Sequence, residues 1–376
     1  MSQFEIKDGV AIIPKGTMTI RHRAFSGCKE LRSVVIPESV LEIGKEAFSD
    51  CTSLTSITIP KSVIELYVDT FKGCSSLESI VVADGNPVFN SREGCNAIIV
   101  TESNILICGC KTTVIPDSVT RIAYYAFYGC TSLENITIPE SVTEIDNGAF
   151  RGCTSLVGIS IPQNVRRISG FDGCTSLENI TIPASVTELG LAAFSDCTSL
   201  KSIAIPESVT EIGKSAFSGC TSLESITIPE GVRIIREYLF QNCESLKSIT
   251  IPKSVVEIEY KSFESCTSLR SITILEGVKE IGEYTFYDCS SLESITIPES
   301  VTKIGERAFG CCTSLTTVTL PTGVNKIEER VFDKCSALTA INVPVGKADF
   351  YKQRLPEQLH DKIVELAPKK MSAICR

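Results

Sequence analysis

Apolar residues return at fixed positions along most of the chain, with polar residues between them. In one copy of the repeated unit the apolar positions are Leu200, Ile203, Ile205, Val209, Ile212, Ala216, Phe217 and Cys220. The same order returns every 23 residues on either side of this copy. A single unit of this length cannot bury so many apolar side chains, but stacked units bury them in one continuous core. The pattern therefore predicts a solenoid.

Each unit predicts a strand followed by a compact return. Ile203 and Ile205 alternate with polar residues in a β-branched run, which is typical of a strand with one buried face. Pro206 ends that strand, because proline has no N–H for the next ladder bond. The apolar residues of 216–220 have helical spacing, so we expect a short helix there. Strands of successive units should pair in parallel, about 4.8 Å apart.

One cysteine closes almost every unit. Thirteen of the 18 cysteines occupy this position: Cys28, Cys51, Cys74, Cys130, Cys153, Cys174, Cys197, Cys220, Cys243, Cys266, Cys289, Cys312 and Cys335. Metal sites need ligands that are close together, such as C-x-x-C, and this series has one cysteine per unit. Buried thiols that act as small hydrophobic side chains are therefore favoured, and disulfides between successive units are the alternative.

The residue before each of these cysteines is in most units Gly, Asp or Asn, as at Gly219 and Asn242. These residue types tolerate a positive φ, so we expect a left-handed stop at this position. Ser265, Cys311 and Lys334 depart from this rule, and we expect their units to be strained or to end differently.

The regular spacing is interrupted twice. The interval from Cys153 to Cys174 is only 21 residues, which indicates a clipped unit. Residues 83–115 form an enlarged unit, in which 97–100 and 105–108 predict a hairpin with both faces covered. The C-x-C spacing inside this insert is only a weak indication of a metal or redox site.

The predicted domain organisation has three parts. Residues 1–345 form the repeat domain, residues 346–366 show helical spacing and predict a helical cap for the last open edge, and residues 367–376 form a tail.

The repeat L-x-x-I-x-I-P-x-x-V-x-x-I-x-x-x-A-F-x-x-C-x-x resembles that of BspA-like leucine-rich repeat proteins over about residues 10–345. The segment 84–91 with 96–99, and the ending at 351–365, also resemble segments of such proteins from gut Bacteroides. The resemblance implies an α/β leucine-rich-repeat solenoid, with a parallel concave β-sheet and short helices or 3-10 turns on the convex side. It further implies a cell-surface or secreted adhesin that binds host matrix proteins, other bacteria or epithelium.

Composition narrows the range of partners. The net charge of −9 argues against nucleic acid and anionic membrane as partners, since both attract basic surfaces. The chain contains no apolar run of the roughly 18 residues that span a bilayer. The first twenty residues lack the pattern of a secretory signal. A protein or glycoprotein ligand remains the expected partner.

The concave face of the predicted sheet is the expected binding surface. It carries the threonine stripe, which consists of Thr58, Thr137, Thr181, Thr227, Thr250, Thr273, Thr296 and Thr319. A row of charged residues runs beside it, with Glu178, Lys201, Glu224, Lys247, Arg270 and Glu293 as the candidate contacts. The alternative is structural, because threonine suits strands and opposite charges pair across them. The insert at 83–115 is a second candidate surface.

Catalysis is not expected. His22 and His360 are the only histidines, and they belong to the first unit and the cap, far in sequence from most possible nucleophiles. The sequence contains no phosphate-binding loop of the form G-x-x-x-x-G-K-[ST]. We therefore predict a non-enzymatic binding protein without a cofactor. An adhesin is favoured by the resemblance, and an intracellular interaction scaffold is favoured by the free thiols.

Overall fold

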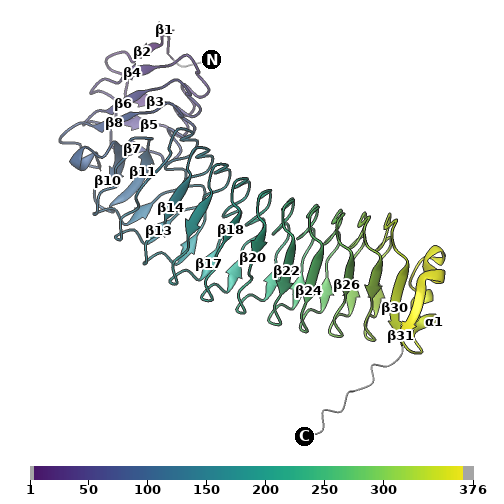
Figure 1. Ribbon diagram of the computed structural model, residues 1–376. Helices are drawn as coiled ribbons and strands as arrows, with labels where there is room; N and C mark the ends of the chain where they lie inside the picture. The colour runs from purple at the N-terminus through teal and green to yellow at the C-terminus, as the bar shows by residue number, and fades with distance from the viewer. Residues whose placement is uncertain (1–3, 367–376) are drawn as a thin grey trace. The chain divides into compact units, whose positions relative to one another are not determined.

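The computed structural model describes residues 4–366 as two compact units, which meet in sequence between Ser208 and Val209. Each unit is a stack of short coils, with one sequence repeat to a coil (Figure 1). The predicted solenoid of stacked parallel strands is thus confirmed. The predicted tail at 367–376 lies outside the described residues.

The first ladder consists of the strands that end at the repeated proline. In the first unit its strands are β2 (Val10–Ile12), β4 (Ser33–Val35), β6 (Ser56–Ile59), β8 (Ser79–Val82), β14 (Gly158–Ser160), β16 (Asn179–Thr181) and β18 (Ser202–Ile203). In the second unit they are β20 (Ser225–Ile226), β22 (Ser248–Ile251), β24 (Ser271–Ile274), β26 (Ser294–Thr296), β28 (Thr317–Thr319) and β30 (Ala340–Pro344). Within each short sheet of this ladder, such as β22 with β24, the strands pair in parallel and in register, so that Ile249 lies opposite Ile272. Both isoleucines are buried, while the serines and threonines between them are exposed.

A second ladder follows the repeated Val-x-x-Ile, and it was not predicted. In the first unit its strands are β3 (Thr19–Ile20), β5 (Glu42–Ile43), β7 (Glu65–Leu66), β12 (Arg121–Ile122), β13 (Glu144–Ile145), β15 (Arg167–Ile168) and β17 (Glu188–Leu189). In the second unit they are β19 (Glu211–Ile212), β21 (Ile234–Ile235), β23 (Glu257–Ile258), β25 (Glu280–Ile281), β27 (Lys303–Ile304) and β29 (Lys326–Ile327). Strands of two residues are too short to produce a recognisable alternation.

The third side of each coil, here called the turn side, carries the repeated phenylalanine and cysteine. The predicted short helix at 216–220 is wrong, because this stretch forms consecutive turns. The N–H of Phe217 donates to the carbonyl of Leu239 in the next coil (3.1 Å), so it is not available for a bond within a helix. Ser215 and Gly219 have φ of 57° and 73°, and these left-handed residues also break helical geometry.

The predicted left-handed residue before the cysteine is confirmed, and this conformation occurs in more units than expected. Ser265, Cys311 and Lys334 adopt φ of 59°, 60° and 59°, so the expectation that their units end differently is wrong. The N–H groups of Ser265 and Cys311 donate to carbonyls of the next coil at 2.8 and 2.7 Å, and these bonds help to offset a conformational cost of about 1–2 kcal/mol. A second left-handed residue five positions before the cysteine, such as Ala192, was not predicted.

Phenylalanines and cysteines fill the core beneath the turn side. Within each run of stacked coils, phenylalanine rings of neighbouring coils lie nearly parallel with centroids 5.0–5.8 Å apart, as for Phe240, Phe263 and Phe286. The thiol of Cys266 donates to the carbonyl of Phe240 in the preceding coil (3.1 Å). Nine other cysteines of the series make the same bond, at 3.0–3.2 Å. Each thiol thus links two coils.

All thirteen cysteines of the series are free, so the interpretation of buried thiols is favoured over disulfides between coils. Burial raises the pKa of Cys51, Cys130, Cys174 and Cys266 to about 12. These thiols are therefore protonated at neutral pH, which is the form that donates a hydrogen bond.

The insert forms the predicted hairpin. It contains β9 (Phe89–Asn90), the 3-10 helix η1 (Arg92–Gly94), β10 (Ala97–Val100) and β11 (Ile105–Gly109). β10 and β11 pair antiparallel, and both are buried along most of their length. β11 then pairs in parallel with β12 and returns the chain to the second ladder. Gly109 is required here, because a Cβ atom at this position would lie 2.2 Å from the Phe127 ring.

The two ends of the described chain differ from the regular coils. At the start, β1 (Ile6–Lys7) pairs antiparallel with β2. At the end, α1 (Ala348–Lys352) and the 3-10 helix η2 (Glu357–Lys362) follow β30. The helical expectation is wrong for the last residues, because β31 (Ile363–Leu366) is a strand that pairs in parallel with β30. This pairing satisfies backbone groups that the last strand would otherwise leave open.

Candidate functional site

The candidate threonines lie on the exposed side of the first ladder. Thr181 belongs to β16 in the first unit, and Thr250, Thr273 and Thr296 belong to strands of the second unit. Thr227 directly follows β20. All five side chains are exposed, and Thr250 lies opposite Thr273 in the parallel register. The ladder therefore places hydroxyl groups one strand spacing apart, about 4.8 Å.

The hydroxyls of these threonines differ from those of threonines elsewhere in the coils. Thr302 and Thr316 donate to carbonyls of the preceding coil, at 3.2 and 3.0 Å. Within residues 4–366, no intramolecular partner is found for the five candidate hydroxyls, which are those of Thr181, Thr227, Thr250, Thr273 and Thr296. Each keeps one donor and two acceptor sites directed to solvent. Their side chains are thus available for contact with a partner.

The six candidate charged residues, Glu178, Lys201, Glu224, Lys247, Arg270 and Glu293, are all exposed. Lys247 and Glu224 form the predicted pair across neighbouring coils, with an Nζ–Oε2 distance of 2.5 Å. Their side chains remain 65% and 50% exposed, so solvent screening limits the contribution of this pair to stability to well below 1 kcal/mol. The pair therefore leaves the row of charges largely open to solvent.

A shallow hollow of about 320 Å³ lies on the first ladder in the first unit, where β14 and β16 pair. It is lined by residues 135–137, 158–160 and 179–181. Gly158 stands where neighbouring coils carry Asn135 and Asn179, so the missing side chain accounts for the depression. Thr181 lies at its rim. The sequence analysis did not identify this hollow, although the glycine in a polar column could have indicated it.

Aromatic residues, which often anchor interfaces, gather away from the threonine stripe. On the turn side of the second unit, Tyr238 and Tyr260 pack edge to face at 5.4 Å. Lys261 lies over the rings of Tyr260 and Tyr284, 5.4 and 5.5 Å from their centroids. This cluster was not predicted from the sequence, because the spacing of its tyrosines, 22 and 24 residues, departs from the repeat.

The remaining candidates are dispersed. His22 is exposed and its Nδ1 lies 2.7 Å from the carbonyl oxygen of Lys45, while His360 lies in η2 with its Nε2 3.0 Å from the carbonyl oxygen of Leu355. In the insert, Cys108 and Cys110 are buried, and their thiols face different backbone carbonyls, those of Gly109 and Asn96. The structure does not bring these residues together in one site.

The coil geometry and the repeat point to one family. The family model described as "BspA type Leucine rich repeat region" matches residues 9–95, 106–170, 169–274 and 233–354, in six copies. The chain belongs to the BspA-type leucine-rich repeat family. The resemblance noted in the sequence is therefore confirmed.

Solved structures of other bacterial leucine-rich repeat proteins agree with this assignment. A leucine-rich repeat protein from Bacteroides ovatus ATCC 8483 is 35% identical, with 95% of this chain and 92% of that chain covered and a TM-score of 0.70. A leucine-rich cell surface protein from Faecalibacterium prausnitzii A2-165 is 29% identical, with 93% and 94% covered and a TM-score of 0.51. A comparison with curated proteins found no match.

The BspA-type fold sets the broad functional class. Leucine-rich repeat solenoids generally bind proteins or other ligands, and they are typically scaffolds for binding rather than enzymes. BspA-type proteins are often associated with the cell surface. Among residues 4–366, no helix has the length and apolar character needed to cross a membrane.

Proposed function

We propose that this BspA-type chain is a non-enzymatic recognition protein that binds a protein or glycoprotein through its threonine stripe. The observation that carries the proposal is that five exposed hydroxyls of the stripe have no intramolecular partner within residues 4–366, and that Thr250 and Thr273 lie opposite each other in the parallel register. The five hydroxyls are those of Thr181, Thr227, Thr250, Thr273 and Thr296. Comparable threonines at other positions of the coil use their hydroxyls to join neighbouring coils. The difference favours an external role for the stripe.

The chemistry of the stripe favours many weak contacts. Hot spots of tight interfaces are enriched in Trp, Tyr and Arg. The stripe is composed of threonine, flanked by serine and asparagine and by charges of both signs. Contacts of this kind accumulate along a ladder, so binding strength should increase with the number of coils engaged. This behaviour suits an extended or repetitive ligand surface.

Adhesion at the cell surface, or after secretion, is the role we propose for this binding. The related protein from Faecalibacterium prausnitzii is described as a cell surface protein, which supports this location. Labelling of intact cells of the source organism with a membrane-impermeant reagent tests it. Labelling before lysis is the expected result, and labelling that requires lysis would contradict an adhesin.

An intracellular interaction scaffold is the second candidate. Free thiols favour it, because the 17 cysteines within the described residues are all unpaired, and disulfides are common in exported proteins. Under this alternative the threonine stripe keeps its role, but its partner is intracellular.

Substitutions on the stripe test the binding surface itself. We expect Thr227→Lys combined with Thr250→Lys to abolish binding to purified matrix glycoproteins and epithelial cells. The matched control is Thr210→Lys combined with Thr302→Lys, which introduces the same charges at exposed positions that flank the second ladder. Equal binding by the two double variants would exclude the stripe of the second unit, provided that both keep the parent circular dichroism spectrum.

The hollow at Gly158 provides a gentler test in the first unit. A Cβ atom at this position would lie 3.6 Å from the carbonyl oxygen of Asn179, an ordinary contact, so Gly158→Asn should fold normally and fill the hollow. Reduced binding with unchanged thermal stability would support a contact at this place. Unchanged binding would restrict the contact surface to other coils.

A further inference from the structure

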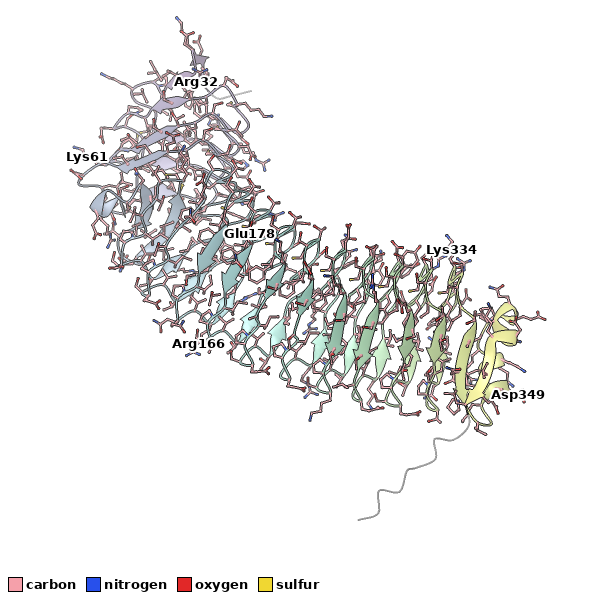
Figure 2. The ribbon with its side chains drawn as sticks, in the orientation of Figure 1. Arg32, Lys61, Arg166, Glu178, Lys334 and Asp349 are labelled. Atoms are coloured by element: carbon pink, nitrogen blue, oxygen red, sulfur yellow. The ribbon has the colours of Figure 1, made fainter. Side chains whose placement is uncertain are left out.

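A second hollow, of about 650 Å³, lies beside the second ladder of the first unit. It is lined by residues of β12, β13 and β15 and of the turns next to them. Its volume is within the range of 300–1,000 Å³ that is common for small-ligand sites. It is separate from the threonine stripe, which belongs to the first ladder. Figure 2 shows Arg166, which lines this hollow, and Glu178, which flanks the stripe, at opposite edges of the ribbon.

The clipped coil accounts for this hollow. The coil between Cys153 and Cys174 is two residues shorter than the others. Within the described residues, β13 ends one sheet and β15 begins another, so the second ladder is interrupted between them. Gly170, with φ of 96°, allows the shortened turn, because a Cβ atom there would lie 2.7 Å from the carbonyl oxygen of Asp146. The fold therefore leaves an opening at one defined place in the stack.

The charged groups of the hollow are held in fixed positions by one another. Arg121 contacts Asp146 at 2.9–3.2 Å and Glu144 at 3.3 Å, and it thereby holds both carboxylates at the wall. Hydrogen bonding to Asp146 raises the pKa of Arg121, so this cation remains charged. Arg167 pairs with Glu188 at 3.0 Å. These carboxylates keep acceptor sites that a hydroxyl group can use.

Arg166 differs from the other two arginines of the hollow. Its guanidinium is exposed, and no carboxylate in the described part of the chain pairs with it. A free guanidinium binds carboxylates through two parallel hydrogen bonds. Tyr124, at 44% exposure, offers the hollow an aromatic ring. Asn147 adds neutral donors and acceptors, and the Thr143 hydroxyl, which donates to the carbonyl of Thr120, adds acceptor sites.

We propose that this hollow binds an acidic saccharide, a sugar ring that bears a carboxylate. The carboxylate pairs with Arg166, and the hydroxyls bond to Asp146, Glu144 and Asn147. The apolar face of the sugar ring lies on the ring of Tyr124. A simple anion would use Arg166 alone, and it would leave the aromatic ring and the fixed acceptors without a role. The combination of the three features favours a sugar acid over an inorganic anion.

The full chain and simple probes test this site. Methyl glucuronide is the probe, and methyl glucoside is its uncharged counterpart. Binding is measured by calorimetry and by saturation-transfer nuclear magnetic resonance. We expect millimolar binding of the glucuronide and at least tenfold weaker binding of the glucoside. Arg166→Gln should weaken glucuronide binding at least tenfold, and Tyr124→Ala should weaken both sugars.

Arg233→Gln is the matched control for the substitution of Arg166. Arg233 occupies the same repeat position in the second unit, is exposed, and its carbonyl accepts an N–H at 2.8 Å, as the carbonyl of Arg166 does. This variant should bind the glucuronide within twofold of the parent chain. Because neither sugar probe depends on the threonine stripe, the result is independent of the proposed adhesive function.

Three outcomes would overturn the proposal. Equal binding of glucuronide and glucoside would exclude recognition of the carboxylate. Equal loss in Arg166→Gln and Arg233→Gln would indicate nonspecific attraction between charges. An acetylated glutamate peptide that competes as well as the glucuronide would show that the hollow recognises a carboxylate on a peptide and not on a sugar.

Discussion

Removal of one phenylalanine from the middle of the stack should destabilise the second unit strongly. Phe263 is fully buried, and its ring stacks on Phe240 at 5.2 Å and on Phe286 at 5.3 Å. Replacement of a buried phenylalanine by alanine costs about 3–5 kcal/mol through lost burial and the resulting cavity. We expect Phe263→Ala to reduce the free energy of unfolding by an amount in this range.

Phe263→Leu separates the stacking from the burial. Leucine retains most of the apolar volume but ends both ring contacts, and each aromatic pair contributes about 0.5–1.5 kcal/mol beyond burial. The expected cost of Phe263→Leu is therefore about 1–3 kcal/mol. Phe332 is the control, because its ring is 5% exposed and has one stacking partner, Phe309. Phe332→Ala should cost less than Phe263→Ala.

Urea unfolding followed by circular dichroism gives these free energies, provided that the transition of the second unit is resolved. Hydrogen exchange by mass spectrometry locates the effect, which should be largest in the coils that contain Phe240 and Phe286, because repeats contact only their neighbours. A cost below about 1.5 kcal/mol for Phe263→Ala would refute the role given to the stack. A neutral Phe263→Leu would refute the contribution of ring stacking alone.

Three further predictions concern the backbone and the thiols. Gly109→Ala should reduce the free energy of unfolding by about 1–3 kcal/mol and lower the melting temperature, because its Cβ would overlap the Phe127 ring. An unchanged melting curve would show that the ring moves aside freely. Burial raises the pKa of Cys266 to about 12, so at pH 8 this thiol should stay protonated and resist a thiol reagent until unfolding, whereas half-buried Cys311 should react before it; rapid native labelling of Cys266 would contradict its burial. Ala192→Gly should leave stability unchanged or raise it by up to about 1 kcal/mol, because Ala192 has φ of 50°, and a loss in thermal melts would argue against left-handed strain there.

The repeat predicted the fold well because every unit repeats the same burial pattern. Leu200, Ile203 and Ile205 are buried as expected, and the parallel pairing seen between β22 and β24 follows from stacking. The predicted helix at 216–220 failed because helical spacing of side chains does not determine where N–H groups bond. In this fold the N–H groups of Ser215, Phe217 and Gly219 bond to the next coil, while those of Ala216, Ser218 and Cys220 bond three residues back within their own coil. Local periodicity carries no information about that partner.

The candidate site was predicted only in part. The exposure of the threonine side chains follows directly from the alternation of residues in the strands. Whether their hydroxyls find a hydrogen-bond partner depends on the distances between coils, which the sequence does not give. The hollow beside Arg166 lies at a coil that is two residues short, where the second ladder is interrupted between β13 and β15. The short spacing from Cys153 to Cys174 was visible in the sequence. The sequence did not show on which side of the coil this shortening would leave a hollow.

The bonds from cysteine thiols to phenylalanine carbonyls make the order of folding and oxidation important. In the unfolded chain the cysteines are exposed thiols with an ordinary pKa near 8.5, and they recur every 23 residues along much of the chain. In the folded chain eleven of the thirteen thiols of the series are buried, and burial raises the pKa of Cys51 and Cys266 to about 12, so oxidants meet few thiolates there. A disulfide formed before folding would remove two thiols that donate hydrogen bonds to phenylalanine carbonyls. It would also link two cysteines that in the folded chain make separate contacts, each with its own preceding coil. Folding thus protects the thiols on which the stacked coils depend, and a chain oxidised too early would lose the contacts that it needs to fold.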